Sequence, residues 1–295
     1  MAAPSHRRGT DRRQLRCGRG CRALHPGGDR LAHAGAGRGG SPPLAAAIAP
    51  RSTFRLVLSY DGTDYRGWQI QAAGPTIQGA LLRAAHAFDP TARVVGASRT
   101  DAGVHALRQT ASLTTAAALA AGAIHGALNA RLPRDIRVLD VHAAPGGFDA
   151  RRAALGKRYA YLIDTDPVAD PLLRRYAWHV PGELDLLAMR RALGHLVGRH
   201  DFGAFCAAPG RQKDPICRVR AAHVVRRHGR VAVLLSADRF LHHMMRTIVG
   251  SAVAVGRGAR APEWLATVLA SRDRRLAGAT APAQGLALVR VLYPR

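Results

Sequence analysis

Residues 54–60 read "FRLVLSY", and the patterned part of the chain begins with them. Apolar residues occupy every second position from Phe54 to Tyr60, which is the period of a strand with one buried face. Residues 76–88, "TIQGALLRAAHAF", then carry an apolar stripe at helical spacing behind Thr76, a residue suited to an N-cap. These two stretches predict a strand followed by a helix.

Similar patterns continue along the chain. In the first half, further strands are predicted over 93–97, 108–115 and 135–142, and a further helix over 117–130. In the second half, strands are predicted over 157–163, 218–227, 230–237 and 285–293, and helices over 183–197, 240–255 and 262–271. The last of these helices begins at Pro262, a favourable first-turn residue, and lies outside the order of elements that the two halves share. The remaining elements have the order β-α-β-β-α-β in each half, which is that of the ferredoxin-like unit.

We therefore predict an α+β fold of two ferredoxin-like halves, residues 51–148 and 149–295. The duplication is one of topology, because the sequence shows no repeat of fixed period. Two mixed or antiparallel sheets are expected to lie side by side, joined near residues 146–153, with a central cleft between them. Such sheets often bind single-stranded RNA, which is an analogy at the level of the fold.

Residues 1–50 differ from the rest of the chain. They contain nine arginines and two aspartates, are rich in Gly, Ala and Pro, and show neither a helical nor a strand period. This composition predicts a disordered basic extension. It could be a tail that contacts RNA, an organelle transit sequence or an extension from a misplaced start codon, and a dispensable extension is the simplest interpretation.

The chain is strongly basic, with 44 Lys+Arg against 19 Asp+Glu and a formal net charge of +25. Such an excess favours a polyanionic partner, because neutralisation of phosphates dominates nucleic-acid affinity. The alternative is a basic soluble protein without such a partner. Only Lys157 and Lys213 are lysines, and the codons for Arg, Ala, Gly and Pro are GC-rich, so part of the charge can reflect genome composition.

The four cysteines, at positions 17, 21, 206 and 217, do not form a disulfide framework for a chain of this length. We interpret them as free thiols in a reducing compartment, since their spacing does not supply four zinc ligands. No apolar run approaches the roughly 18 residues of a membrane span. The sequence thus predicts a cytoplasmic protein without a membrane partner.

One loop stands out chemically. Residues 97–106 read "ASRTDAGVHA" and place Asp101 two positions after Arg99, with Gly103 permitting a tight turn. A carboxylate beside a guanidinium stays ionised, and an ionised carboxylate can serve as a nucleophile or general base. The alternative is a structural Asp that caps the loop, with Arg99 as its ion-pair partner.

Read with "YDGTDYRGWQIQ" (60–71) and "FLHHMMRTIVG" (240–250), the string "SRTDAGVHA" resembles the tRNA pseudouridine synthases of the TruA family. The resemblance runs from Phe54 to the C-terminal "YPR". It implies isomerisation of uridines 38, 39 and 40 in the anticodon arm of tRNA by a homodimer. It also implies that no cofactor and no metal take part, which agrees with the lack of nucleotide-binding motifs or paired metal carboxylates.

The resemblance implies roles for four residues. Asp101 matches the catalytic aspartate, and Arg99 matches the arginine that helps open the stem and takes the place of the flipped base. Tyr159 matches the tyrosine that stacks on the target base. Arg246 matches the arginine that pairs with the catalytic carboxylate. Two positions depart from the family: Ser98 replaces a frequent Gly, and Ile70 replaces a frequent basic residue.

The residues themselves support part of this assignment. In the predicted helix 240–255, His242, Arg246 and Gly250 form a stripe beside the apolar one, so Arg246 needs an anion and Asp101 is the natural candidate. The alternative is that Arg246 extends into solvent. Tyr161 is expected in the core. His105 could shuttle protons, although a loop-fixing hydrogen bond is the simpler interpretation.

Three features leave alternatives open. Trp68 could stack on a nucleotide or pack on the core, and residues 210–220 could contact phosphates or only solvent. As a whole, the chain could be a non-catalytic RNA-binding module, which would not need a lone carboxylate beside arginine. It could also be a metal-dependent nuclease, but the acids nearest to Asp101 in the sequence, Asp89 and Asp135, do not have metal-ligand spacing.

Overall fold

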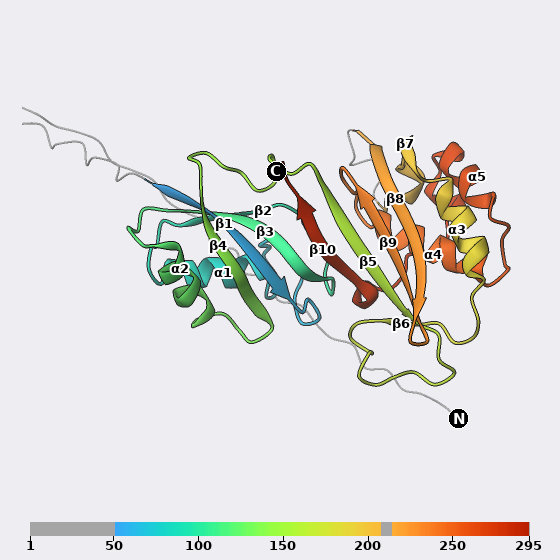
Figure 1. Cartoon of the computed structure of the whole chain (residues 1–295), viewed down its shortest axis with the longest axis horizontal. Helices are drawn as coiled ribbons and strands as arrows, with labels where there is room; N and C mark the ends of the chain where they lie inside the picture. The colour runs from blue at the N-terminus through green and yellow to red at the C-terminus, as the bar shows by residue number, and fades with distance from the viewer. Residues whose placement is uncertain (1–50, 208–213, 295) are drawn as a thin grey trace, which may run out of the picture. The chain divides into compact units, whose positions relative to one another are not determined.

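Strand β1 (Ser52–Tyr60) shows the predicted alternation, with Phe54, Leu56, Leu58 and Tyr60 buried. The structure, a computed structural model, describes residues 51–207 and 214–294, which belong to one compact unit (Figure 1). The predictions for residues 1–50, for Cys17 and Cys21, and for 208–213 of the basic loop lie outside the described residues.

The first half has the ferredoxin-like topology expected from its element order. Its elements after β1 are α1 (Ile77–His86), β2 (Arg93–Gly96), β3 (His105–Thr115), α2 (Ala121–Asn129) and β4 (Ile136–Ala144). The strands lie in the spatial order β4-β1-β3-β2, and each adjacent pair is antiparallel. The hydroxyl of Thr76 caps α1 by accepting a hydrogen bond from the Gly79 amide, as predicted.

The second half repeats this topology. Its elements are β5 (Gly156–Asp164), β6 (Trp178–His179), α3 (Leu186–Gly194), β7 (Gly198–Asp201), β8 (Ile216–Arg227), β9 (Arg230–Ala237), α4 (Met244–Gly256), α5 (Trp264–Ser271) and β10 (Leu286–Leu292), with short 3₁₀ turns at Gly203–Phe205, Arg274–Leu276 and Ala283–Gly285. Strand order β10-β5-β9-β8, again antiparallel throughout, matches that of the first half. The short strands β6 and β7 were not predicted, because two and four residues carry too little periodicity.

The two predicted sheets are in fact one. Strand β10 pairs with β5 and also, in parallel, with the beginning of β3 through Ala287–His105 and Leu288–Ala106. One edge of β3 is paired with β1 along its length. The other edge is shared by two strands, β2 and then β10, which begins to pair with β3 where β2 has ended (Figure 1). The expectation of separate sheets was therefore wrong. The loop between β2 and β3 lies at this seam.

Three helices begin at a different residue from the one predicted, and each difference has a structural reason. Helix α4 begins at Met244 and not at residue 240, because His243 adopts the left-handed conformation with φ of 59°. Helix α2 begins at Ala121 and not at residue 117, because Asp89 and Thr115 bind the backbone amides of residues 116 and 117. In α3 the Asp185 carboxylate supplies the cap, which fixes the first helical residue at 186.

Two aromatic residues discussed above, Trp68 and Tyr161, belong to the core. Trp68 is 2% exposed and packs so closely on Gly96 that a Cβ there would meet the indole, so Trp68 is a core residue. Tyr161 is fully buried, as predicted, and its hydroxyl donates to the Pro282 carbonyl.

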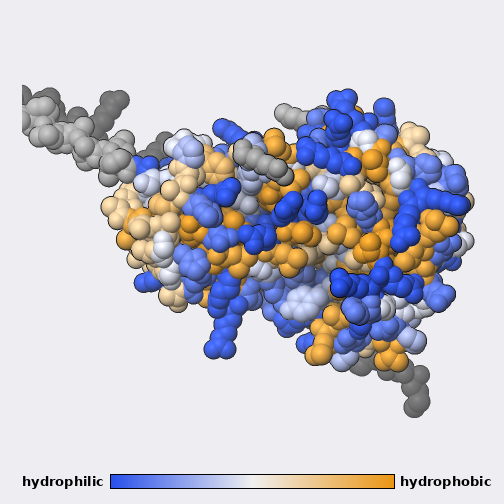
Figure 2. Space-filling model, viewed as in Figure 1, coloured by the Kyte–Doolittle hydropathy of each residue, from blue (hydrophilic) through white to orange (hydrophobic). Residues whose placement is uncertain are grey.

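Cys206 and Cys217 are buried free thiols. None of the described helices has the length and apolar character needed to cross a bilayer. Figure 2 shows hydrophilic residues interspersed with hydrophobic ones over the visible face.

Candidate active site

The loop that joins β2 to β3 is fixed from several sides. The Thr100 hydroxyl bonds the Tyr60 hydroxyl at 2.8 Å, and the Thr100 carbonyl accepts from the Trp68 amide. Gly103 has a φ of 75°, which confirms the predicted tight turn. Gln109 donates to the carbonyl of Ser98 at 2.8 Å. The side chain of Asp101 is thus presented on a braced loop at the seam of the sheet.

Asp101 is surrounded by cationic and imidazole groups from the start of α4. Its Oδ2 lies 3.6 Å from Nη1 of Arg246 and 3.5 Å from Nε2 of His243, and its Oδ1 lies 3.8 Å from Nε2 of His242. Arg99 is exposed and is not among the ion-pair partners of Asp101 in the described part of the chain. The alternative that paired these two residues was therefore wrong, and the guanidinium beside the carboxylate belongs to Arg246.

Arg246 is held in place by its backbone and by its side chain. Its Nε donates to the Ala281 carbonyl at 2.8 Å, and its own carbonyl accepts from the Ala281 amide at 3.1 Å. The side chain is 15% exposed, so it does not extend into solvent as the alternative required. A fixed guanidinium therefore places a positive charge 3.6 Å from the Asp101 carboxylate.

Tyr159 approaches the loop from β5. It is buried, and its hydroxyl bonds the Ser98 hydroxyl at 2.9 Å. Its ring packs edge-on against Phe240 with centroids 4.9 Å apart. Burial raises the pKa of Tyr159 to about 12, so the phenol is neutral at physiological pH. The departure at Ser98 therefore has a structural effect, because it ties the loop to the tyrosine.

These residues line a cavity of about 430 Å³. The lining comes from the β2–β3 loop, from the segment ahead of β5 and β5 itself, and from residues 240–246, and includes Arg99, Asp101, Arg151, Lys157, Tyr159, His242, His243 and Arg246. Burial, and secondarily the charge of Arg151, lowers the pKa of Lys157 to about 8. The cavity therefore combines one carboxylate with a strongly basic wall, and it brings together all four residues singled out from the sequence.

Sequence reasoning gave no role to the two histidines beside Asp101. Their rings stack at 3.9 Å, and they precede α4, so the predicted helical stripe through His242 does not exist. The signal available in the sequence was their position directly ahead of the helix that carries Arg246. The ligand atoms of Asp101, His242 and His243 all lie within 4.8 Å of one another, but the Arg246 guanidinium would repel a divalent cation there.

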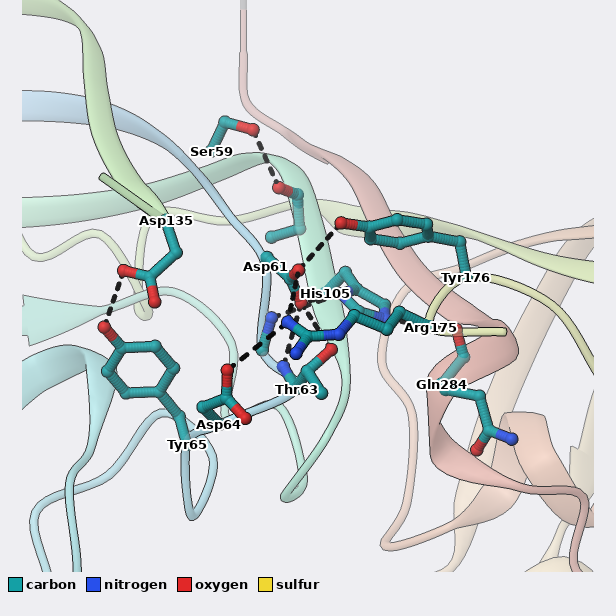
Figure 3. A network of polar contacts seen from close by, with 12 residues as sticks. Ser59, Asp61, Thr63, Asp64, Tyr65, His105, Asp135, Arg175, Tyr176 and Gln284 are labelled. Atoms are coloured by element: carbon teal, nitrogen blue, oxygen red, sulfur yellow. Dashed lines mark hydrogen bonds and ion pairs between the residues drawn. The ribbon is translucent and has the colours of Figure 1, made fainter. Parts of the chain in front are cut away.

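A second polar network surrounds Asp61 and His105, the first residue of β3 (Figure 3). His105 accepts a hydrogen bond at Nδ1 from the Gly62 amide at 3.1 Å, and its Nε2 lies 3.1 Å from the Gln284 carbonyl. Asp61 accepts at 2.8 Å from the hydroxyl of Tyr176, whose ring also packs on His105. His105 therefore fixes the beginning of β3 and joins both halves, which confirms the loop-fixing interpretation.

Comparison with known proteins gives a consistent result. The family described as tRNA pseudouridine synthase matches residues 56–151 and 192–294. The chain is 42% identical over 242 residues to the tRNA pseudouridine synthase A of Myxococcus xanthus, covering 81% of this chain and 91% of that protein. It is 44% identical over 248 residues to the protein of the same name from Chloroflexus aurantiacus, covering 82% and 89%.

Proposed function

The chain belongs to the tRNA pseudouridine synthase family, and from that premise we propose that it isomerises uridines 38, 39 and 40 of tRNA with Asp101 as the catalytic carboxylate. As a member of this family it is an isomerase. The observation that carries the assignment of Asp101 is its position in the cavity, 3.6 Å from a guanidinium that is itself fixed by the Ala281 carbonyl.

The geometry supports this chemistry step by step. The reacting uridine must leave the stack, which costs a few kcal/mol. In this proposal the ring of Tyr159 stacks on the base within the cavity, and the exposed Arg99 takes the vacated place in the stem. Asp101 then either attacks the nucleoside covalently or abstracts a sugar proton. Both routes use a carboxylate oxygen of Asp101, and the Arg246 guanidinium lies 3.6 Å from that carboxylate.

The partner follows from the charge. A net charge of +25 suits a folded polyanion, and exposed arginines lie side by side on the strands, as with Arg158 opposite Arg290. We propose tRNA as the substrate, a homodimer as the working form and the cytoplasm as the location, as the resemblance and the composition implied. Light scattering of the purified full chain tests the dimer, since a monomer mass at working concentration contradicts it.

The direct test is to incubate the protein with an unmodified tRNA transcript and map pseudouridine at single-nucleotide resolution. We expect conversion only within positions 38–40, and none in a matched transcript that has cytidine at these positions. Conversion at other sites alone would contradict the assigned positions. A protein that binds the transcript without converting any uridine would instead be the RNA-binding module considered above.

Removal of divalent metals should leave the reaction unaffected. Arg246 already supplies the positive charge beside Asp101, so neither the carboxylate nor the histidines need an ion for this chemistry. We expect the initial rate in excess EDTA to stay within about twofold of the untreated rate, provided monovalent salt keeps the tRNA folded. A rate that falls with EDTA and returns with one specific metal would reject the metal-free mechanism.

A further inference from the structure

His243 is held in a backbone conformation that histidine does not favour. Its φ of 59° and ψ of 2° lie in the left-handed region, where glycine and asparagine are the usual residues. It occupies the N-cap position of α4, but its side chain makes no capping hydrogen bond. Such strain persists where a side chain has another use, and here the imidazole is directed at the carboxylate of Asp101.

The surroundings keep this imidazole neutral and oriented. Burial, together with electrostatic interactions with His242, Arg246 and Arg274, lowers the pKa of His243, and these effects outweigh the attraction of Asp101. Stacking on His242 at 3.9 Å fixes the ring plane, and the side chain lines the cavity with 26% of its surface exposed. A neutral imidazole keeps one ring nitrogen with a free lone pair, and the ring of His243 lies beside the catalytic carboxylate, with its Nε2 3.5 Å from Oδ2 of Asp101.

The proposed reaction, on which this inference rests, requires a proton acceptor at this place. When C5 of the rotated uracil bonds to C1′ of the ribose, C5 still carries its hydrogen. Loss of that proton leaves the C–H electron pair to form the C5=C6 bond, while the electrons of the N1=C6 bond move to N1, which takes up a proton. One proton leaves C5 and one reaches N1, so the step balances without an oxidant or a co-reactant.

The cavity offers few groups that could accept the C5 proton. As C5 bonds to C1′, Asp101 either leaves C1′ or returns the sugar proton to C2′, and its carboxylate then stays beside the Arg246 guanidinium, 3.6 Å away. The guanidinium of Arg246 has no acceptor atom, and the phenol of Tyr159 is neutral and bonded to Ser98. Lys157 is mostly protonated at neutral pH. Of the two imidazoles, His242 is half-exposed and lies farther from Asp101, at 3.8 Å against 3.5 Å. We propose that His243 is the general base that removes the C5 proton of the rotated uracil.

The test is the variant His243→Asn in the full-length protein. Asparagine tolerates the left-handed backbone, so the variant should fold, and its circular dichroism and melting temperature should match those of the wild type. Single-turnover conversion is measured with transcripts containing uridine or [5-²H]uridine. We expect the variant to be about 10²-fold slower, and its deuterium isotope effect to be larger than that of the wild type, because proton loss becomes limiting.

An equal isotope effect in both proteins would overturn the inference, since a residue that only positions Asp101 slows both isotopologues alike. A normal rate in the variant would also overturn it. His223→Asn, at an exposed position of β8, is the matched control and should behave as wild type. If the wild type itself converts no uridine, the proposed function fails; if only the predicted isotope effect is missing, this inference fails alone.

The pH profile gives a second measurement. The wild-type rate should fall as the pH drops through the lowered pKa of His243, below the ordinary histidine value of about 6.5, because protonation removes the lone pair. This limb should be missing in His243→Asn. An acid limb at the same pH in both proteins would contradict the assignment of His243.

Discussion

Replacing Asp101 by Asn is expected to lower the single-turnover rate of pseudouridine formation by roughly 10³-fold or more. The amide has nearly the shape of the carboxylate, so the loop and the cavity should persist. It has neither the charge that pairs with Arg246 nor the ability to attack the sugar or accept its proton. The loss should therefore appear in the rate of the chemical step and not in the binding of tRNA.

Two measurements separate these effects. Filter binding should give a tRNA affinity for Asp101→Asn within a few-fold of wild type, because that affinity comes mainly from phosphate neutralisation. Asp140→Asn is the matched control, since Asp140 is a half-exposed carboxylate of β4 whose ion-pair partner among the described residues is the exposed Arg108. It should retain full activity. Normal turnover by the Asp101 variant would remove the basis for the catalytic assignment.

Much of the fold could be predicted because its signals are local. The alternation that predicted β1 depends on a few neighbouring residues, and so do the apolar stripe and the Thr76 cap that predicted α1. The structure confirms both elements. The joining of the two sheets was not visible, because the pairing of β10 with β3 involves residues about 180 positions apart. The start of α4 was missed since nothing local in "FLHHMM" announces a left-handed histidine.

The candidate active site, too, could be predicted only in part from the sequence. The loop with Asp101 and the helix with Arg246 were recognised from long motifs, and the structure brings them to 3.6 Å. The neighbouring Arg99 was a plausible partner by sequence distance alone, yet the loop turns it outward to the exposed wall of the cavity. Position in the sequence therefore identified the participants, but only tertiary structure could show which cation faces the carboxylate.

Gly250 illustrates how packing distant from the chemistry controls that cation. It lies one turn beyond Arg246 on α4, and a Cβ at this position would meet the Ala279 carbonyl oxygen far inside van der Waals contact. The segment through Ala281, which bonds Arg246 through both its amide and its carbonyl, can approach the helix only because residue 250 lacks a side chain. The glycine thus helps to fix the guanidinium.

Gly250→Ala is therefore expected to destabilise the protein by about 3 kcal/mol, because the obstructing atom is backbone and the gain in helix propensity is smaller than the clash. The melting temperature should fall by roughly 6–12 °C. Pseudouridine formation below that temperature should also slow, since a displaced Ala281 releases Arg246 from its position beside Asp101.

Gly126→Ala, at an exposed position of α2 where an added Cβ meets no atom within 4 Å, is the control and should raise the melting temperature slightly. If both variants melt alike and remain equally active, packing at Gly250 does not set the position of Arg246.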